Sequence, residues 1–315
     1  MRRSFQLAIL GASLVTWVGA AQQPVFRGTG DAVRVFATVT DRDGRLVTTL
    51  KQADFEVRDE GKPQPITTFD NTPRAIRIIV MLDVSGSMEG NLPLLRGASA
   101  QLFRRLLAED RARIGSFGVD VTISPSFTRD DQELLREIPA RINPDAPTPL
   151  WRAVDQAMDG FDKEGDERHV ILVLSDGKDS GPISFRQKNV SQAEVIDRAR
   201  AEDVMVYGIG MRSRPLRSPN FPVGPGPGGL QAMLTADLPD SGLARVAEET
   251  GGGYSEIRFG EDLGAAFAQV ADELHSQYLL GYALPKKDGK VHDIQVRVAQ
   301  KGLKPRAKKS YLAPR

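Results

Sequence analysis

The sequence predicts an α/β protein with a doubly wound, mostly parallel sheet, because long apolar runs alternate with stretches of helical length. Apolar runs too continuous for a sheet with one wet face cover residues 76–82, 170–174 and 204–209. Such runs are typical of parallel strands that are buried on both faces. Helices are expected at residues 92–107, 130–138, 150–161 and 191–202. Strands that alternate with helices in this way favour the doubly wound fold.

Further elements extend the same scheme and set the expected bounds of this domain at residues 74–276. Additional strands are expected at residues 112–117, 121–127 and 254–257, and additional helices at 241–250 and 261–275. The loop at residues 213–229 is too rich in Pro and Gly for helix or strand. Because it follows a predicted strand, it should emerge at the carboxyl edge of the sheet, either as a partner-selecting flap or as a surface insertion.

Short β segments flank this domain. Before it, within residues 25–72, strand-like patterns cover residues 33–40, 55–58 and 66–69. After it, within residues 277–315, they cover residues 277–283, 292–298 and 306–312. A few strands make a weak core alone, so we expect the two segments to pack together as a β-sandwich. The basic residues from Lys286 onward fit solvent-facing strand edges, with a docking face as the alternative.

The first 21 residues have the layout of an export signal. Arg2 and Arg3 precede an apolar stretch at residues 7–20, and small residues follow up to Ala21. This pattern predicts a signal peptide at residues 1–21 and a mature protein in the periplasm, the cell envelope or the medium. The stretch is shorter than the roughly 18 residues of a transmembrane helix, and an uncleaved anchor is the alternative. The arginine pair also partly resembles a twin-arginine signal.

Composition limits the chemistry that is available. The 42 basic and 41 acidic residues nearly cancel, so no global field attracts nucleic acid or anionic lipid. The absence of cysteine excludes disulfides, thiolate metal ligands and cysteine nucleophiles. Any metal site must therefore use oxygen or histidine ligands.

Oxygen-bearing side chains gather directly after the first buried run, at Asp83-Val84-Ser85-Gly86-Ser87. Ligands of open α/β sheets bind beyond the carboxyl ends of the strands, so this position is meaningful. The alternate residues Asp83, Ser85 and Ser87 can turn their oxygens toward one point, and Gly86 allows the backbone to bend sharply. Each of these residues alone would also suit a helix cap or a turn.

Two distant residues strengthen this pattern. Thr148 lies in a loop that opens the next predicted helix, and Asp176 follows the buried run at residues 170–174. Both segments should reach the same edge of the sheet as the Asp-x-Ser-x-Ser stretch. With these positions filled, residues 74–275 resemble the von Willebrand factor A family, whose metal-ion-dependent adhesion site combines Asp-x-Ser-x-Ser with a distant Thr and a distant Asp.

The resemblance implies a bound divalent cation and a role for each of the five residues. Ser85 and Ser87 would coordinate the ion directly, and Thr148 directly or through water. Asp83 and Asp176 would act largely through water. The ion would be Mg²⁺, with Mn²⁺ or Ca²⁺ as alternatives. Residues 54–57 and 278–282 further resemble an exported bacterial family related to von Willebrand A proteins, which implies an envelope location but no specific activity.

The residue types also make physical sense for this chemistry. Mg²⁺ takes six oxygen ligands and usually keeps some waters. Neutral hydroxyl ligands leave the ion electrophilic, whereas one more carboxylate would repel an acidic ligand by about 4 kcal/mol at roughly 4 Å. The site therefore favours an Asp or Glu side chain of a partner protein.

Other functions fit the sequence less well, and we expect a binding protein rather than an enzyme. A phosphatase of the haloacid dehalogenase type needs a second Asp at the position that Ser85 occupies. A Ser-His-Asp hydrolase would need a Gly-x-Ser-x-Gly elbow, which the chain lacks. Three histidines follow no metal or triad spacing: His169, His275 and His292. A magnesium-dependent, phosphatase-like hydrolase and a structural module without metal remain the alternatives.

Overall fold

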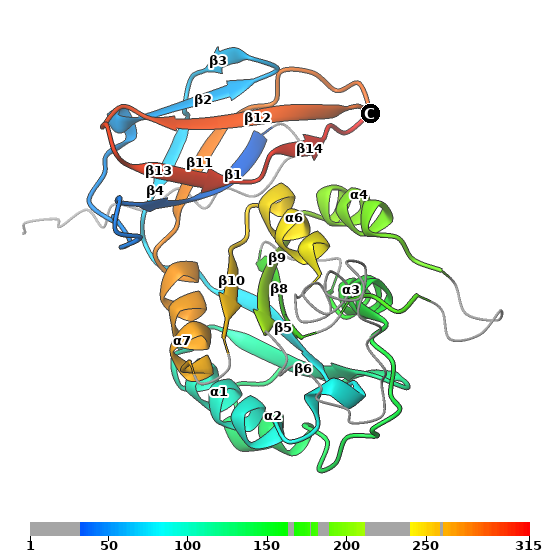
Figure 1. Ribbon diagram of the computed structural model, residues 1–315. Helices are drawn as coiled ribbons and strands as arrows, with labels where there is room; N and C mark the ends of the chain where they lie inside the picture. Colours follow the sequence, from blue (N-terminus) through cyan, green and yellow to red (C-terminus); the bar gives the residue numbers. More distant parts are fainter. Residues whose placement is uncertain (1–31, 163–166, 177, 182–188, 212–239, 259–260) are drawn as a thin grey trace, which may run out of the picture.

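The computed structural model describes residues 32–162, 167–176, 178–181, 189–211, 240–258 and 261–315. The expected leader (residues 1–21) and the Pro/Gly-rich loop (residues 213–229) lie outside these ranges. Within the described part of the chain, no helix has both the length and the apolar character needed to cross a bilayer. The described residues form an α/β unit and, beside it, two antiparallel sheets (Figure 1).

The central sheet of the α/β unit has six strands in the order β10-β9-β8-β5-β6-β7. Its strands are β5 (Ile76–Asp83), β6 (Arg111–Phe117), β7 (Val121–Ile123), β8 (Arg168–Ser175), β9 (Val204–Met211) and β10 (Tyr254–Ile257). Neighbouring strands are parallel, except that β7 runs antiparallel to β6. The three apolar runs form β5, β8 and β9 at the centre, which confirms the predicted fold class.

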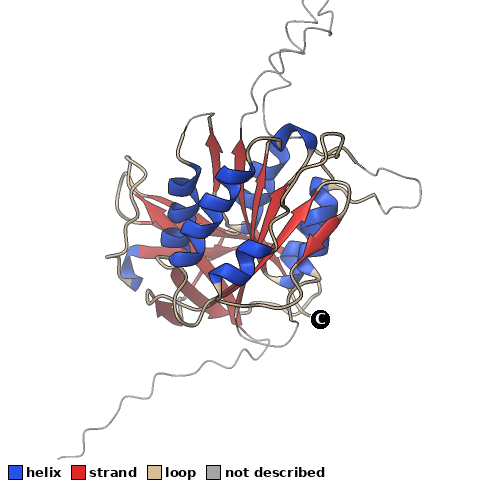
Figure 2. Cartoon of the chain, turned by 90° about the horizontal axis from the view of Figure 1, so that it is seen from below, coloured by secondary structure: helices blue, strands red, loops and turns tan. Residues whose placement is uncertain are grey.

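Helices cover both faces of this sheet (Figure 2). They are α1 (Leu92–Arg104), α2 (Asp131–Arg136), α3 (Leu150–Met158), α4 (Gln192–Glu202), α6 (Ser241–Thr250) and α7 (Leu263–Leu274). Alternation along β5 sends Ile78 and Val80 into a core shared with α1, α2 and α7. Ile79 and Met81 point the other way, into a core shared with α3, α4 and α6. Burial on both faces is why the run is continuously apolar.

The N- and C-terminal β segments pair with each other in two four-stranded sheets, β13-β1-β11-β4 and β14-β12-β2-β3. Their strands are β1 (Ala32–Thr40), β2 (Phe55–Asp59), β3 (Lys62–Gln64), β4 (Thr68–Asp70), β11 (Tyr278–Ala283), β12 (Val291–Val298), β13 (Lys304–Ala307) and β14 (Ser310–Leu312). β1 lies between β11 and β13, and β12 pairs with β2. Val35, Val57 and Leu280 share one apolar core, so neither segment buries its strands alone.

Three details differ from the expected elements. The stretch after β2, where no strand is expected, forms a tight turn at Glu60 and Gly61, both with positive φ, and returns as β3. The strand expected at residues 306–312 is divided between β13 and β14, which belong to different sheets. β7 ends at Ile123 instead of continuing to residue 127, and Pro125 lacks the N–H that a continued ladder would need.

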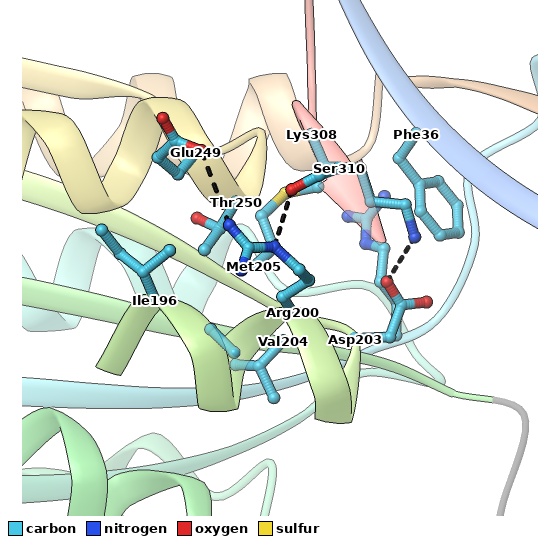
Figure 3. A pocket seen from close by; sticks show the side chains of 12 residues that line it. Phe36, Ile196, Arg200, Asp203, Val204, Met205, Glu249, Thr250, Lys308 and Ser310 are labelled. Atoms are coloured by element: carbon cyan, nitrogen blue, oxygen red, sulfur yellow. Dashed lines mark hydrogen bonds and ion pairs between the residues drawn. The ribbon is translucent and has the colours of Figure 1, made fainter. Parts of the chain in front are cut away.

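The paired β segments lie against the amino ends of the parallel strands. At the start of β8, the Arg168 guanidinium donates to the Gln277 side chain and to the Leu274 carbonyl, at 2.8 Å each. Nearby, Arg200 Nε of α4 donates to Ser310 Oγ at 2.6 Å, and Lys308 Nζ is 2.7 Å from Asp203 Oδ1 (Figure 3). The carboxyl ends of the parallel strands lie at the opposite edge of the sheet.

Candidate metal centre

The Asp-x-Ser-x-Ser stretch occupies the point where the strand order of the central sheet reverses. After β5 the chain first adds β6 on one side and later adds β8 on the other side. Loops leaving the carboxyl ends of such strands diverge and leave a crevice between them. Asp83 is the last residue of β5, and a short 3-10 helix at Gly86–Met88 follows it. The predicted location at the rim of the sheet is where the structure places these residues.

Asp83 anchors the turn that follows β5. Its side chain is fully buried. Its Oδ1 accepts a hydrogen bond from the Ser85 backbone N–H at 2.8 Å, and its Oδ2 accepts one from Ser175 Oγ at 2.5 Å. The carboxylate therefore fixes both its own loop and the end of the neighbouring strand β8.

A chain of hydroxyls leads from this anchor toward solvent. Ser85 Oγ and Ser87 Oγ lie 3.1 Å apart, and Ser87 Oγ donates to Asp176 Oδ1 at 2.7 Å. Ser85 and Asp176 are buried, whereas Ser87 is exposed. The structure thus brings four of the five predicted residues into one connected group with an open side.

Gly86 allows the Thr148 loop to approach this group. A Cβ at this position would clash with the Pro144 carbonyl oxygen. The Gly86 N–H donates to the Ala146 carbonyl at 3.0 Å. A glycine is required here by close backbone contact rather than by an unusual φ.

Thr148 is held by backbone contacts on its other side. Its carbonyl accepts hydrogen bonds from the N–H groups of Leu150 and Ser180, at 2.9 Å each. Its side chain is 8% exposed. The loop therefore lies between the Gly86 turn and the segment that follows Asp176, and Thr148 sits at the same rim as the other four residues.

Two supporting residues were not assigned a role from the sequence. Ser175 directly precedes Asp176 in the sequence, and its hydroxyl donates a hydrogen bond to Asp83. Asp179 accepts from the Trp151 N–H at 3.2 Å and so satisfies a free donor in the first turn of α3, just after Thr148. That contact joins residues 28 positions apart, and no local pattern announces it.

The electrostatics of the site favour a cation. Burial raises the pKa of Asp83 to about 7, and the nearby charge of Asp176 adds to this rise. Hydrogen bonds from Ser175 and Ser85 oppose the rise without cancelling it. Keeping Asp83 ionised beside Asp176 therefore costs free energy, and a bound cation would offset this cost by neutralising the negative charge.

The donor set fits a hard divalent ion. It consists of two carboxylates and three hydroxyls, and oxygen-only sets of this kind suit Mg²⁺. In the described ranges, no group of three or more His, Cys, Asp or Glu side chains could hold a metal. A histidine-rich or carboxylate-rich metal site is therefore absent from that part of the chain, and the hydroxyl-rich rim is the candidate.

Other polar clusters have structural partners. His275 lies 2.8 Å from Asp110, and His292 lies 3.1 Å from both Asp59 and Asp288. The ring of His169 stacks on Phe161. The groove in Figure 3 lies at the junction with β14, where Lys308 pairs with Asp203 and Arg168 donates to Gln277 and to the Leu274 carbonyl.

Comparison with known proteins identifies the central unit. The family model of the von Willebrand factor type A domain matches residues 78–219. No curated protein matches the chain. Similar solved structures include proximal thread matrix protein 1 of the mussel byssus, with a TM-score of 0.50, 13% identity, and coverage of 70% of this chain and 51% of that one. A structure of that mussel protein has zinc in its MIDAS motif.

Two bacterial structures are also similar. The conserved hypothetical protein BatB from Bacteroides thetaiotaomicron gives a TM-score of 0.46 at 17% identity, covering 63% of this chain and 98% of that one. A von Willebrand factor type A protein from Catenulispora acidiphila gives a TM-score of 0.48 at 12% identity, covering 90% of this chain and 74% of that one. At such identities the likeness extends to the fold alone. The family match and the fold together establish that this chain contains a von Willebrand factor type A domain.

Proposed function

We propose that this protein is a metal-dependent binding module that captures an acidic side chain of a partner protein. Five residues would hold the ion: Asp83, Ser85, Ser87, Thr148 and Asp176. The observation that carries the proposal is the connected group from Asp83 through the two serines to Asp176, which opens to solvent at the switch point of the sheet.

Each residue has a distinct task in this mechanism. Buried Asp83 and Asp176 supply negative charge and orient the serines, while the serine hydroxyls present neutral oxygens. The bound ion, Mg²⁺ or alternatively Mn²⁺ or Ca²⁺, offers a Lewis-acidic position to one partner carboxylate. Because Ser87 lies on the exposed side, the partner would approach from solvent over this residue.

A binding role is favoured over hydrolysis by the position of Ser85. In the rival phosphatase chemistry an acid would stand there as the general acid or base. Ser85 instead lies 3.1 Å from Ser87 Oγ within the hydroxyl group, where it is suited to hold an ion. A broad phosphatase screen on the purified protein tests the rival directly, and we expect no turnover.

The direct experiment is a pull-down from envelope extract with and without EDTA. Wild-type protein should retain its partner in Mg²⁺ and release it in EDTA, and the Asp83→Ala and Ser85→Ala variants should retain none. Ser116→Ala is the matched control, since it removes a hydroxyl that pairs with Thr122 on the neighbouring hairpin, outside the motif. A partner that stays bound in EDTA and to Asp83→Ala would refute the proposal.

We also propose that the protein acts outside the cytoplasm, on the basis of the signal-like first 21 residues. Intact-mass measurement of exported protein should give a mature chain that begins near Ala21 or Gln22. A mature species that keeps Met1 would contradict cleavage.

A further inference from the structure

Three exposed carboxylates stand near the proposed ion site, one at the end of the turn after Asp83 and two on segments that pack against that turn. Glu89 follows the short helix of that turn, and its N–H donates to the Gly86 carbonyl at 3.2 Å. Asp145 lies between Pro144 and Ala146, which both contact Gly86. All three of Glu89, Asp120 and Asp145 are exposed.

Asp120 is brought to the rim by the turn between β6 and β7. The Val84 N–H donates to the Phe117 carbonyl at 2.9 Å, and the Gly118 N–H donates to the Asp120 carbonyl at 3.0 Å. A Cβ on Gly118 would lie 3.1 Å from the Val84 carbonyl oxygen, so this turn is closely packed on the turn after Asp83. Asp120 therefore belongs to the same rim as the ion site.

The charge of this rim is strongly one-sided, whereas the whole chain carries a formal net charge of only +1. The described rim residues are 83–91, 117–121, 143–149, 175–176 and 178–181. Their acids are Asp83, Glu89, Asp120, Asp145, Asp176 and Asp179, and their one cation is Lys178. Adding a divalent ion to these described residues leaves their summed formal charge negative. A partner that offered only a carboxylate would meet repulsion around the ion, and one that also offered cations would be attracted.

One apolar side chain completes the pattern. Val119 stands beside Asp120 and is 46% exposed. Lys and Arg bury their hydrocarbon stems along apolar surface while the charged head reaches an acid. Val119 and Asp120 together offer both contacts within one turn.

We propose that the acidic residue captured by the ion is flanked in the partner by Lys or Arg residues. Their charged heads pair with Glu89, Asp120 and Asp145, and one stem lies on Val119. This inference rests on the proposed function and narrows its partner to a protein surface with one acid among basic residues.

Phage-displayed peptides with a fixed central Asp and randomised flanks test this inference. Full-length protein is the bait, selection is carried out in Mg²⁺, and bound phage are eluted with EDTA. Eluted sequences should be enriched in Lys and Arg beside the Asp. The charge-reversed variant Glu89→Lys/Asp120→Lys/Asp145→Lys should bind a selected basic peptide roughly tenfold or more weakly at low salt.

A matched control makes the same change in net charge at a place far from the rim. Asp43→Lys/Glu56→Lys/Asp293→Lys alters two exposed acids and the partly exposed Glu56 on the paired β segments, at the other end of the sheet, and should bind the basic peptide like wild type. The neutral variant Glu89→Gln/Asp120→Asn/Asp145→Asn should give an intermediate loss and guards against a folding defect in the reversed one. Val119→Ser should weaken binding less than charge reversal does.

The outcomes separate the two proposals. Binders that elute with EDTA but show no basic enrichment, or that bind the rim and control variants equally, would overturn this inference and leave metal-dependent capture standing. A selection that yields no EDTA-eluted binder would overturn metal-dependent capture and the inference with it.

Discussion

Two buried aspartates at opposite ends of the central sheet have opposite electrostatic surroundings. Asp83 ends β5 at the carboxyl edge, where burial and then the charge of Asp176 raise its pKa to about 7. Asp110 precedes β6 at the amino edge. Burial alone would raise the pKa of Asp110, but hydrogen bonds from His275 and from the N–H groups of Ile76 and Leu107 lower it below the usual value.

The difference lies in what surrounds the two carboxylates, and it supports the proposal that Asp83 helps to hold a cation. Asp110 has a partner for each of its oxygens, and Glu273 near the junction is similarly engaged by Thr38, Tyr207 and Arg306. Each oxygen of Asp83 also accepts a hydrogen bond, but burial and the nearby charge of Asp176 together outweigh these bonds and raise the pKa. Perturbed pairs of this kind mark candidate sites, because a buried charge without compensation costs stability.

The largest expected effect is a difference in the free energy of unfolding between variants of the two aspartates. Asp110→Ala leaves His275 and two backbone N–H groups without their acceptor, and should lower the free energy of unfolding by about 3–5 kcal/mol. Asp83→Asn removes a buried charge that lies near Asp176, and should not lower the free energy of unfolding. Urea unfolding at pH 7 in EDTA measures both. Equal losses in the two variants would break the comparison.

The second expected effect is a pH dependence that belongs to Asp83. Folded protein keeps the Asp83 proton up to about pH 7, whereas the unfolded chain releases it near the ordinary aspartate pKa of 3.8. Between these values the folded state binds more protons, so stability should fall as pH rises, by about 4 kcal/mol at most. Metal-free thermal melts from pH 4 to 7 measure this loss of stability. Wild type should lose more stability over this range than Asp83→Asn, which lacks the titrating group. Identical profiles of the two proteins would contradict the raised pKa.

A smaller effect is expected at Ser175, which lies outside the five predicted residues. Ser175→Ala removes the 2.5 Å hydrogen bond to Asp83 and should weaken Mg²⁺ binding by about 10–100-fold, as loss of a ligand-orienting contact does. Ser99→Ala is the matched control, because the Ser99 hydroxyl is buried without a described hydrogen-bond partner and lies in α1. Titration of both variants with Mg²⁺ measures their affinities for the ion. Equal affinity would mean that Ser175 does not position Asp83 for the ion.

The sequence predicts the centre of the molecule better than its periphery. β5, β8 and β9 could be predicted because burial on both faces demands continuous apolar residues. β3 and the division between β13 and β14 could not, because the same residues suit a turn, one strand or two. Which sheet a short strand joins depends on partners far away in the chain, such as the pairing of Ala37 with Ala307.

The site shows the same division between local and distant information. The spacing of Asp83, Ser85 and Ser87 indicates that their oxygens converge, but these residues are assigned to a metal site only together with Thr148, Asp176 and the family resemblance. Placing Thr148 and Asp176 beside them required the strand order as well. Ser175 and Asp179 were missed because their partners lie 92 and 28 positions away. Both residues act by orienting others, which leaves no spacing signature.

The most direct test of the account is isothermal titration of metal-free protein with Mg²⁺ at millimolar concentration. We expect wild type to bind one ion per chain, Ser99→Ala to match it, and Ser85→Ala/Ser87→Ala to lose binding while keeping its unfolding transition. The reason is that these hydroxyls lie at the rim and not in either apolar core. Wild-type protein that takes up no divalent ion under these conditions, or a double serine variant that binds as well as wild type, would contradict the metal centre.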